Sequence, residues 1–196
     1  MEPTNASLYG KGVFTTIAIV DGSPFLWENH WRRLSVNAET IGIDLTNYSK
    51  SVVADALAVS INEDQITNGR ARITFSDERP SATWPRESSD STKLSIITGG
   101  IRAIPNNFKL DVSPYPVNSL SPLAGVKSCN YLENLMAMDD AKTSGCHEAV
   151  RVNERGEVTS AAMANVFWLN DDVLYTPSLA TGCLAGTTRE FILENL

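Results

Sequence analysis

The lysine at position 127 lies in a stretch of otherwise uncharged residues. It carries the only charged side chain between Asp111 and Glu133, and most of its near neighbours are apolar. A lysine held away from water has a lowered pKa, and its neutral amine can then act as a nucleophile. A surface lysine that extends its ammonium group into water would also fit this local pattern. Lys127 is therefore a candidate nucleophile.

The segment 182–189, GCLAGTTR, places two glycines and two threonines just before a predicted helix. Free backbone N–H groups at the start of a helix, together with hydroxyl groups, can bind a phosphate group. An ordinary threonine N-cap has the same local sequence. Thr187 and Thr188 are the residues at which a phosphate would bind.

Two arginines are candidates for binding an anion. Arg33 follows Arg32 in a predicted helix that also holds His30, so the two arginines point to different faces and one could turn inward. Arg72 alternates with apolar residues in a predicted strand, where a guanidinium can bind a carboxylate through two hydrogen bonds. Solvated charges would explain both patterns as well. His147 is interpreted as structural, and no cluster of metal ligands is found.

Hydrophobic periodicity predicts the elements that position these residues. In the first half, strands are predicted at 13–20, 24–26, 70–76 and 93–98, and helices at 28–41 and 50–61. In the second half, a helix is predicted at 130–144, strands at 147–153, 157–160, 166–169 and 173–176, and a helix from Thr188. Glycines and prolines between 99 and 124 suggest a boundary near Ile104. We therefore expect an α+β fold with two domains, 1–104 and 105–196.

The composition limits the classes of function. The chain has 196 residues, is 42% hydrophobic and carries a net charge of −7, which disfavours nucleic acid as a partner. Three cysteines without a CxxC spacing argue against disulfides and zinc. Neither a signal peptide nor a membrane-spanning segment is recognisable. We expect a soluble, cytoplasmic protein.

Taken together, these stretches resemble the class IV pyridoxal-phosphate enzymes, the family of class IV aminotransferases and aminodeoxychorismate lyases. The matching motifs occur in order along nearly the whole chain: LYGKGVFTT at 8–16, ExHxxRL at 28–34, SPLAGVKSCNYLEN at 121–134, GxVT at 156–159, NVF at 165–167, Thr176-Pro177, and LAGTTR at 184–189.

The resemblance implies a role for each candidate residue. Lys127 would bond covalently to pyridoxal 5'-phosphate and then move the Cα proton of the substrate. Arg33 and the backbone amides of Thr187 and Thr188 would hold the cofactor phosphate. Tyr131 would lie near the cofactor ring, whereas Arg72 and Thr15 would contact the substrate. The family has a small α/β domain and a larger barrel-like domain and works as a homodimer, for which Trp84 is a candidate contact.

Two features depart from the family pattern. Where the family has a glutamate that pairs with the pyridine nitrogen of the cofactor, this chain has Ser160, and Glu157 lies three residues away, on the opposite strand face. Family chains also continue well beyond the helix that begins at Thr188. This chain is therefore either a natural short form or a fragment of a longer one.

Three hypotheses for the reaction follow from the resemblance. The first is a lyase like 4-amino-4-deoxychorismate lyase, which releases pyruvate and 4-aminobenzoate. The second is a branched-chain or D-amino-acid transaminase, and the third is an inactive relative that only binds the cofactor. Phe14-Thr15-Thr16 favours the lyase, because the transaminases more often have Phe-Glu there. Ser160 favours the lyase or the inactive relative.

Overall fold

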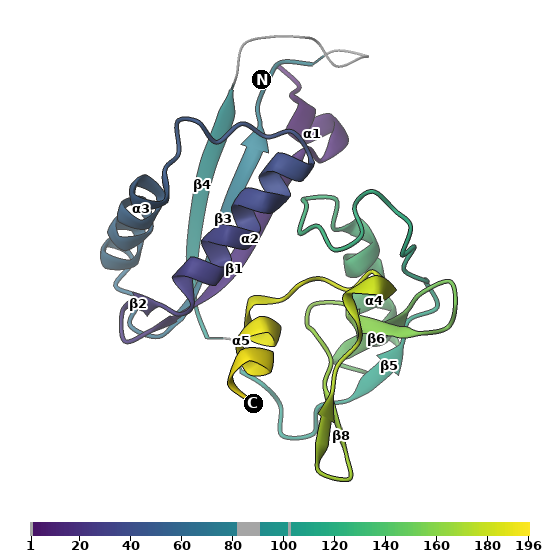
Figure 1. Ribbon diagram of the computed structural model, residues 1–196. Coiled ribbons are helices and arrows are strands. Elements are labelled where there is room, and N and C mark those ends of the chain that lie inside the picture. The colour runs from purple at the N-terminus through teal and green to yellow at the C-terminus, as the bar shows by residue number, and fades with distance from the viewer. Residues whose placement is uncertain (1, 82–90, 102) are drawn as a thin grey trace. The chain divides into compact units, whose positions relative to one another are not determined.

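The computed structural model describes residues 2–81, 91–101 and 103–196 (Figure 1). Contacts divide the chain into two compact units. The first comprises Met1–Arg102 with Lys127–Asn130, and the second comprises Ala103–Val126 with Tyr131–Leu196. Helices and strands occur in both units, so the predicted α+β class is confirmed. Trp84 lies outside the described residues.

The first unit is built on a four-stranded antiparallel sheet in the order β2-β1-β3-β4. Its elements are α1 (Asn5–Tyr9), β1 (Gly12–Val20), β2 (Ser23–Pro24), α2 (Trp27–Thr40), α3 (Lys50–Glu63), β3 (Gly69–Asp77) and β4 (Thr92–Gly100). The turn between β1 and β2 uses Asp21 and Gly22, both with positive φ, as expected for a two-residue hairpin turn.

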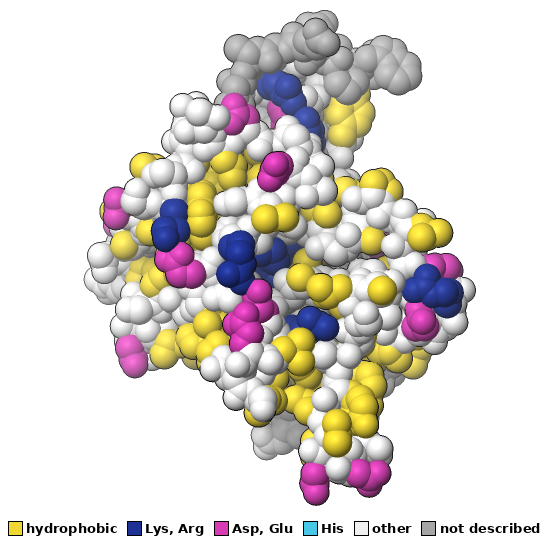
Figure 2. Space-filling model, viewed as in Figure 1, with side chains coloured by type: hydrophobic (Ala, Val, Ile, Leu, Met, Phe, Trp, Pro, Cys, Tyr) yellow, Lys and Arg dark blue, Asp and Glu magenta, His cyan; other side chains and the backbone are white. Residues whose placement is uncertain are grey.

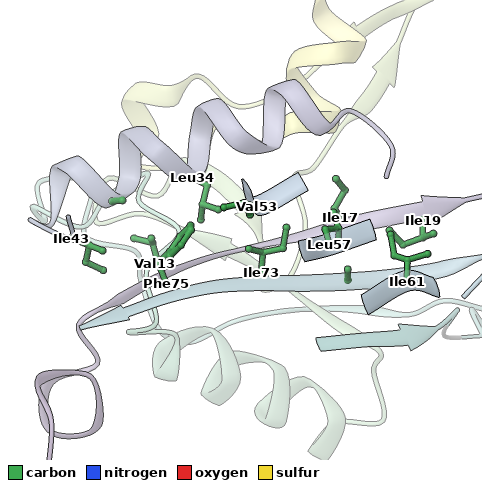
Figure 3. Close-up of a cluster of buried hydrophobic side chains, with 12 residues drawn as sticks. Val13, Ile17, Ile19, Leu34, Ile43, Val53, Leu57, Ile61, Ile73 and Phe75 are labelled. Atoms are coloured by element: carbon green, nitrogen blue, oxygen red, sulfur yellow. The ribbon is translucent and has the colours of Figure 1, made fainter. Parts of the chain in front are cut away.

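Alternation along β1 determines which side chains enter the core. Val13, Ile17 and Ile19 are all at most 2% exposed and point toward α2 and α3. Figure 3 shows them with Leu34 of α2 and Leu57 of α3 between the helices and the sheet. Each such side chain stabilises the fold by roughly 1.5–3 kcal/mol. Thr15 lies in the same row as these apolar residues.

The segment Lys127–Asn130 adds a short pairing to the start of β1. The backbone N–H of Phe14 donates to the carbonyl of Lys127 at 3.0 Å, and that of Cys129 donates to the carbonyl of Gly12 at 2.7 Å. This edge of β1 is open because β2 pairs only with Ile19 and Val20. A Cβ at Gly12 would lie 2.8 Å from Sγ of Cys129, so glycine allows the close approach.

The second unit contains a three-stranded sheet in the order β5-β6-β7 and a separate hairpin, β8-β9. Its elements are β5 (Leu110–Val112), α4 (Leu132–Thr143), β6 (Glu148–Val152), β7 (Val158–Ala161), β8 (Trp168–Asn170), β9 (Val173–Tyr175), η1 (Leu179–Thr181) and α5 (Thr187–Asn195). Small residues of α4 pack against Ala149 of β6 and Ala162, which allows the helix to lie close to the sheet.

Most predicted elements are confirmed within a few residues, and the differences have local causes. The strand predicted at 24–26 is shorter, because Leu26 has φ +57° and already begins the turn into α2. Hydrophobic periodicity did not predict the short elements α1, β5 and η1, which have 5, 3 and 3 residues. Among the described residues, no helix combines the length and the apolar character needed to cross a membrane.

Candidate active site

Lys127 lies on the first unit, over the aromatic ring of Phe14. Its Nζ is 4.6 Å from the ring centroid. Burial, followed by the nearby charges of Arg33 and Arg72, lowers the pKa of Lys127 from 10.5 to about 7. Near neutral pH, Lys127 is therefore a neutral amine in a large fraction of the protein molecules. The neutral amine is the form that attacks an aldehyde or accepts a proton.

Arg72 lies against the same ring. Its guanidinium carbon is 3.6 Å from the centroid of Phe14, and its Nε donates to Oγ1 of Thr74 at 3.4 Å. Arg72 faces Thr16 in the register of β1 and β3, and Phe14 faces Thr74, so the ring and the guanidinium are diagonal neighbours on one sheet face. This face is opposite the core row, and Arg72 is exposed there.

Arg33 approaches from α2 and is held by a buried threonine. Its Nη2 donates to Oγ1 of Thr15 at 2.7 Å, and the same oxygen lies 2.6 Å from Nδ1 of His30. Thr15 is 0% exposed and His30 is 5% exposed. Burial, and then the charges of Arg33 and Lys127, lower the pKa of His30 to about 3. His30 is therefore neutral at physiological pH.

The first unit thus brings together four of the candidate residues. Lys127, Arg33 and Arg72 are close enough for the two arginines to lower the pKa of the lysine. The hydroxyl of Thr15 lies among Arg33 and His30 on the helix side of the sheet, and its expected contact with the substrate stays a prediction. The neighbour on the face of Arg72 is Thr16, which is exposed.

The second unit contains Ser160 and Tyr131. Ser160 is half-buried on β7, where it pairs with Arg151 of β6, and Tyr131 is half-buried immediately before α4. Glu157 lies before β7 and is exposed. Its carboxylate accepts hydrogen bonds from Nδ2 of Asn153 at 2.7 Å and Nε of Arg155 at 2.9 Å. Glu157 is thus engaged in a surface ion pair.

The glycine loop precedes α5 as predicted. Gly186 is the N-cap of α5, Thr187 is its buried first residue, and Thr188 is exposed. Nδ2 of Asn165 donates to the carbonyl of Leu184 at 2.9 Å. A Cβ at Gly186 would lie 1.8 Å from Oδ1 of Asn165, so the loop closes tightly on this amide.

The sequence did not assign a role to three residues that contact the candidate residues or the loop before α5: Phe14, His30 and Asn165. All three lie inside the quoted motifs, but the motifs do not indicate contacts. Helical spacing offers one signal for His30, because it precedes the buried Leu34 by four residues and therefore shares its face. The other two contacts depend on packing between segments that are distant in the sequence.

The chemistry of these groups fits pyridoxal phosphate. An amine with a pKa of about 7 suits bonding to an aldehyde, and two arginines close to it suit a phosphate and a carboxylate. A tight loop at the start of α5 offers backbone amides to an anion. The described residues contain no group of three or more His, Cys, Asp or Glu that could hold a metal ion.

Comparisons with known proteins identify the family. The family model described as amino-transferase class IV matches residues 12–196, so this chain belongs to that family. The aminodeoxychorismate lyase of Bacillus subtilis is 30% identical over 96% of this chain and 65% of its own length. A branched-chain-amino-acid aminotransferase named as putative in Methanocaldococcus jannaschii is 29% identical over 95% of this chain and 66% of its own. The chain therefore spans about two thirds of these relatives.

A solved structure shows the same fold. A 4-amino-4-deoxychorismate lyase structure from Legionella pneumophila, also named as putative, superimposes with a TM-score of 0.88 at 27% identity and covers 98% of this chain and 70% of that one. A branched-chain aminotransferase from the archaeon Thermoproteus uzoniensis, solved with norvaline, gives 0.88 at 24% identity, covering 98% and 67%. Two-domain class IV enzymes are thus the fold neighbours.

Proposed function

We propose that this protein is a pyridoxal-phosphate-dependent class IV enzyme. It cleaves an amino-acid-type substrate by an elimination like that of 4-amino-4-deoxychorismate lyase. That reaction converts 4-amino-4-deoxychorismate into pyruvate and 4-aminobenzoate. The observation that carries the proposal is the half-buried Lys127, whose amine has a pKa of about 7 and lies beside Arg33 and Arg72. This is the amine that such chemistry requires, in a family whose members include lyases and aminotransferases.

Each candidate residue would have a separate role in the reaction. The cofactor, when bound, would accept the electron pair released as a proton leaves the substrate carbon that bears the amino group. Lys127 would bond to the cofactor and then hold and return that proton through Nζ. Arg33 and the backbone amides of Thr187 and Thr188 would bind the phosphate. Arg72, exposed on the face of Phe14, would bind a substrate carboxylate.

Two residues of the second unit would contact the cofactor ring. Tyr131 would lie near the ring, and Ser160 would face the pyridine nitrogen. Ser160 has no charge with which to stabilise a protonated pyridine. A weaker electron sink would still support elimination of a good leaving group but would slow transamination. The Phe14-Thr15-Thr16 sequence and the Bacillus subtilis relative favour the lyase as well.

A transaminase acting on branched-chain or D-amino acids is the alternative function. The archaeal relative, at 29% identity, favours it almost as strongly as the lyase relative favours elimination. The two functions differ in product. A lyase forms pyruvate without an added keto acid, whereas a transaminase requires a keto acid as the amino-group acceptor. A protein that retains the cofactor but forms neither product would support a binding-only role.

The experiment that tests the proposal is borohydride reduction of the protein loaded with pyridoxal phosphate, followed by peptide mapping. A pyridoxyl group should be found on Lys127. Lys127→Ala should abolish this label, whereas Lys142→Ala, which removes an exposed lysine paired with Asp139, should leave it unchanged. A label on another lysine in the unaltered protein would refute the assignment. Pyruvate release from 4-amino-4-deoxychorismate, followed with lactate dehydrogenase, tests the reaction.

We also propose a small-molecule partner, a homodimeric assembly and a cytoplasmic location. On the face drawn in Figure 2, lysine and arginine side chains form small groups next to acidic ones. Acidic side chains also mark the tip of the β8-β9 hairpin at the bottom of the same view. Together with a net charge of −7, this distribution supports a small anionic ligand over nucleic acid.

A further inference from the structure

The contact between Thr15, His30 and Arg33 links β1 to α2 within the first unit. Thr15 lies between Val13 and Ile17 in the apolar row of β1, and all three are 0% exposed. Its hydroxyl is the polar group in that row. Nη2 of Arg33 lies 2.7 Å from Oγ1 of Thr15, and Nδ1 of His30 lies 2.6 Å from the same atom. A buried hydroxyl without partners destabilises a fold, so these contacts matter for stability as well as geometry.

The direction of each hydrogen bond follows from what the groups can donate. Arg33 only donates, because its guanidinium stays protonated and has no acceptor. It therefore uses a lone pair of the Thr15 oxygen. The hydroxyl has one hydrogen, and in the described structure its remaining side-chain partner is Nδ1 of His30. The hydroxyl therefore donates to Nδ1, which requires a neutral His30 that carries its hydrogen on Nε2.

The surroundings favour the neutral form of His30. Burial lowers the pKa of His30 to about 3, with smaller contributions from the charges of Arg33 and Lys127. A protonated imidazole would direct a second donor at the oxygen that already accepts from Arg33. The hydroxyl hydrogen would then lose its acceptor. Two donors and no acceptor around one buried hydroxyl would weaken the hydrogen bond between Thr15 and the guanidinium of Arg33.

We propose that Thr15 and His30 are positioning residues that hold the guanidinium of Arg33 in the orientation needed to bind the cofactor phosphate. The inference rests on the proposed function, in which Arg33 binds that phosphate. It gives Thr15 a role different from the substrate contact implied by the family resemblance. The structure supports this role because the Thr15 side chain lies on the helix side of the sheet, opposite the face of Phe14 and Arg72.

The test compares Thr15→Val with Thr15→Ser in titrations of the full chain with pyridoxal phosphate and with pyridoxal. Valine keeps the shape and removes the acceptor, whereas serine keeps the hydroxyl. Thr15→Val should weaken binding of the phosphorylated ligand about tenfold, the lower end for a hydrogen bond to a charged group. Binding of pyridoxal should change less than about threefold, and Thr15→Ser should restore most of the difference.

Two further variants, Arg33→Ala and Arg32→Ala, distinguish an error in this inference from an error in the proposed function. Arg33→Ala should remove the preference for the phosphorylated ligand, and Arg32→Ala, which alters an exposed residue of α2, should retain it. If Arg33→Ala removes the preference and Thr15→Val does not, the positioning role is wrong and the phosphate anchor stands. If Arg33→Ala leaves the preference intact, both are wrong.

Nitrogen-15 NMR of the histidine rings in the full chain gives a second readout that does not depend on the cofactor. The sequence has two histidines, so His147→Gln leaves only the signals of His30. We expect the Nε2–H tautomer and no titration between about pH 5 and 8, where an unperturbed histidine titrates. Thr15→Val should shift the Nδ1 resonance. An Nδ1–H tautomer, or protonation near pH 6.5, the ordinary value, would overturn the proposed network.

Discussion

The amine of Lys127 depends on its neighbours as well as on burial. Arg33 and Arg72 both lower its pKa, which lies at about 7. Because lysine is positive when protonated, removing a nearby positive charge stabilises the protonated form and raises the pKa. The neutral amine is the reactive form above this pKa and is lost as the pH falls below it. The charge of Arg72 thus helps to set the pH range in which Lys127 can react.

Arg72→Gln should therefore shift the pH dependence of Lys127 labelling upward. The measurement is competitive acetylation of the cofactor-free chain across pH 5–10, with peptide mapping, and the midpoint for Lys127 should rise from about 7. The reaction of this lysine at pH 7 should fall accordingly. Arg70→Gln is the control, because Arg70 is an exposed arginine of the same strand and is not among the charges that lower the pKa of Lys127. An unchanged midpoint in Arg72→Gln would contradict the electrostatic account.

Ser160 is the residue that we propose to face the pyridine nitrogen of the cofactor. If Ser160 faces the pyridine nitrogen, Ser160→Glu should supply the missing negative charge, which raises the pKa of a nearby base by roughly 1–3 units. Transaminase activity with simple amino acids should then increase. Glu157→Gln is the control, since that carboxylate is already paired with Arg155 on the surface. If Ser160→Glu changes neither the absorbance spectrum nor the reaction preference, Ser160 does not lie at the nitrogen.

The loop before α5 depends on one close contact. A Cβ at Gly186 would lie 1.8 Å from Oδ1 of Asn165, although φ of −71° would itself permit alanine. Gly186→Ala should therefore displace the loop, destabilise the protein by about 1–3 kcal/mol, and weaken pyridoxal phosphate binding. Thermal unfolding and ligand titration measure the two effects.

Gly99→Ala provides the matched control for the loop. A Cβ at Gly99 would meet no atom within 4 Å, so this change should alter neither the unfolding temperature nor ligand binding by much. Asn165→Ala combined with Gly186→Ala should recover part of the lost stability, because it removes the clashing amide oxygen. Wild-type stability of Gly186→Ala alone would show that the loop is not constrained in this way.

Periodicity predicted the long elements well, because burial enforces it. Val13, Ile17 and Ile19 of β1 alternate as the core requires, and helix α3 buries Val53, Leu57 and Ile61 at helical spacing. The short elements α1 and β5 are too brief for periodicity to reveal. Helix α1 instead depends on a capping box between Thr4 and Ser7, and β5 on parallel pairing with β6.

The candidate site was predictable only in part for a similar reason. Motif resemblance indicated Lys127 and Arg33, but it could not show that Thr15 bonds to Arg33 within the core or that Phe14 lies under both Lys127 and Arg72. Such contacts join residues between 18 and 113 positions apart, so local sequence does not encode them. The strand alternation did contain one usable signal, since it places Thr15 in the core row with Val13 and Ile17.

The chain passes from the second unit into the first at Lys127. The segment Lys127–Asn130 packs with the first unit, whereas the residues on either side of it belong to the second. The catalytic candidate is therefore fixed to the sheet of the first unit through the pairing with β1. Its position depends on the folding of that unit, and substitutions in the core of β1 should change the reactivity of Lys127 along with stability.

The β8-β9 hairpin carries an apolar surface that argues for association. The hairpin exposes Leu169 by 67% and Val173 by 50%, and the rings of Trp168 and Tyr175 stack at a centroid distance of 5.7 Å. A lone two-stranded hairpin is marginally stable in water, and contiguous exposed apolar surface is typical of interfaces. Together with the dimeric character implied by the family resemblance, this surface leads us to predict that two copies of the chain associate.

Light scattering coupled to size exclusion tests this prediction directly. At micromolar concentration the measured mass should be near twice 21.3 kDa, and it should fall on dilution if the association is reversible. Because a dimer buries apolar area that a monomer exposes, the unfolding temperature should also rise with protein concentration. A mass of one chain across the whole concentration range, with a constant unfolding temperature, would contradict the homodimer.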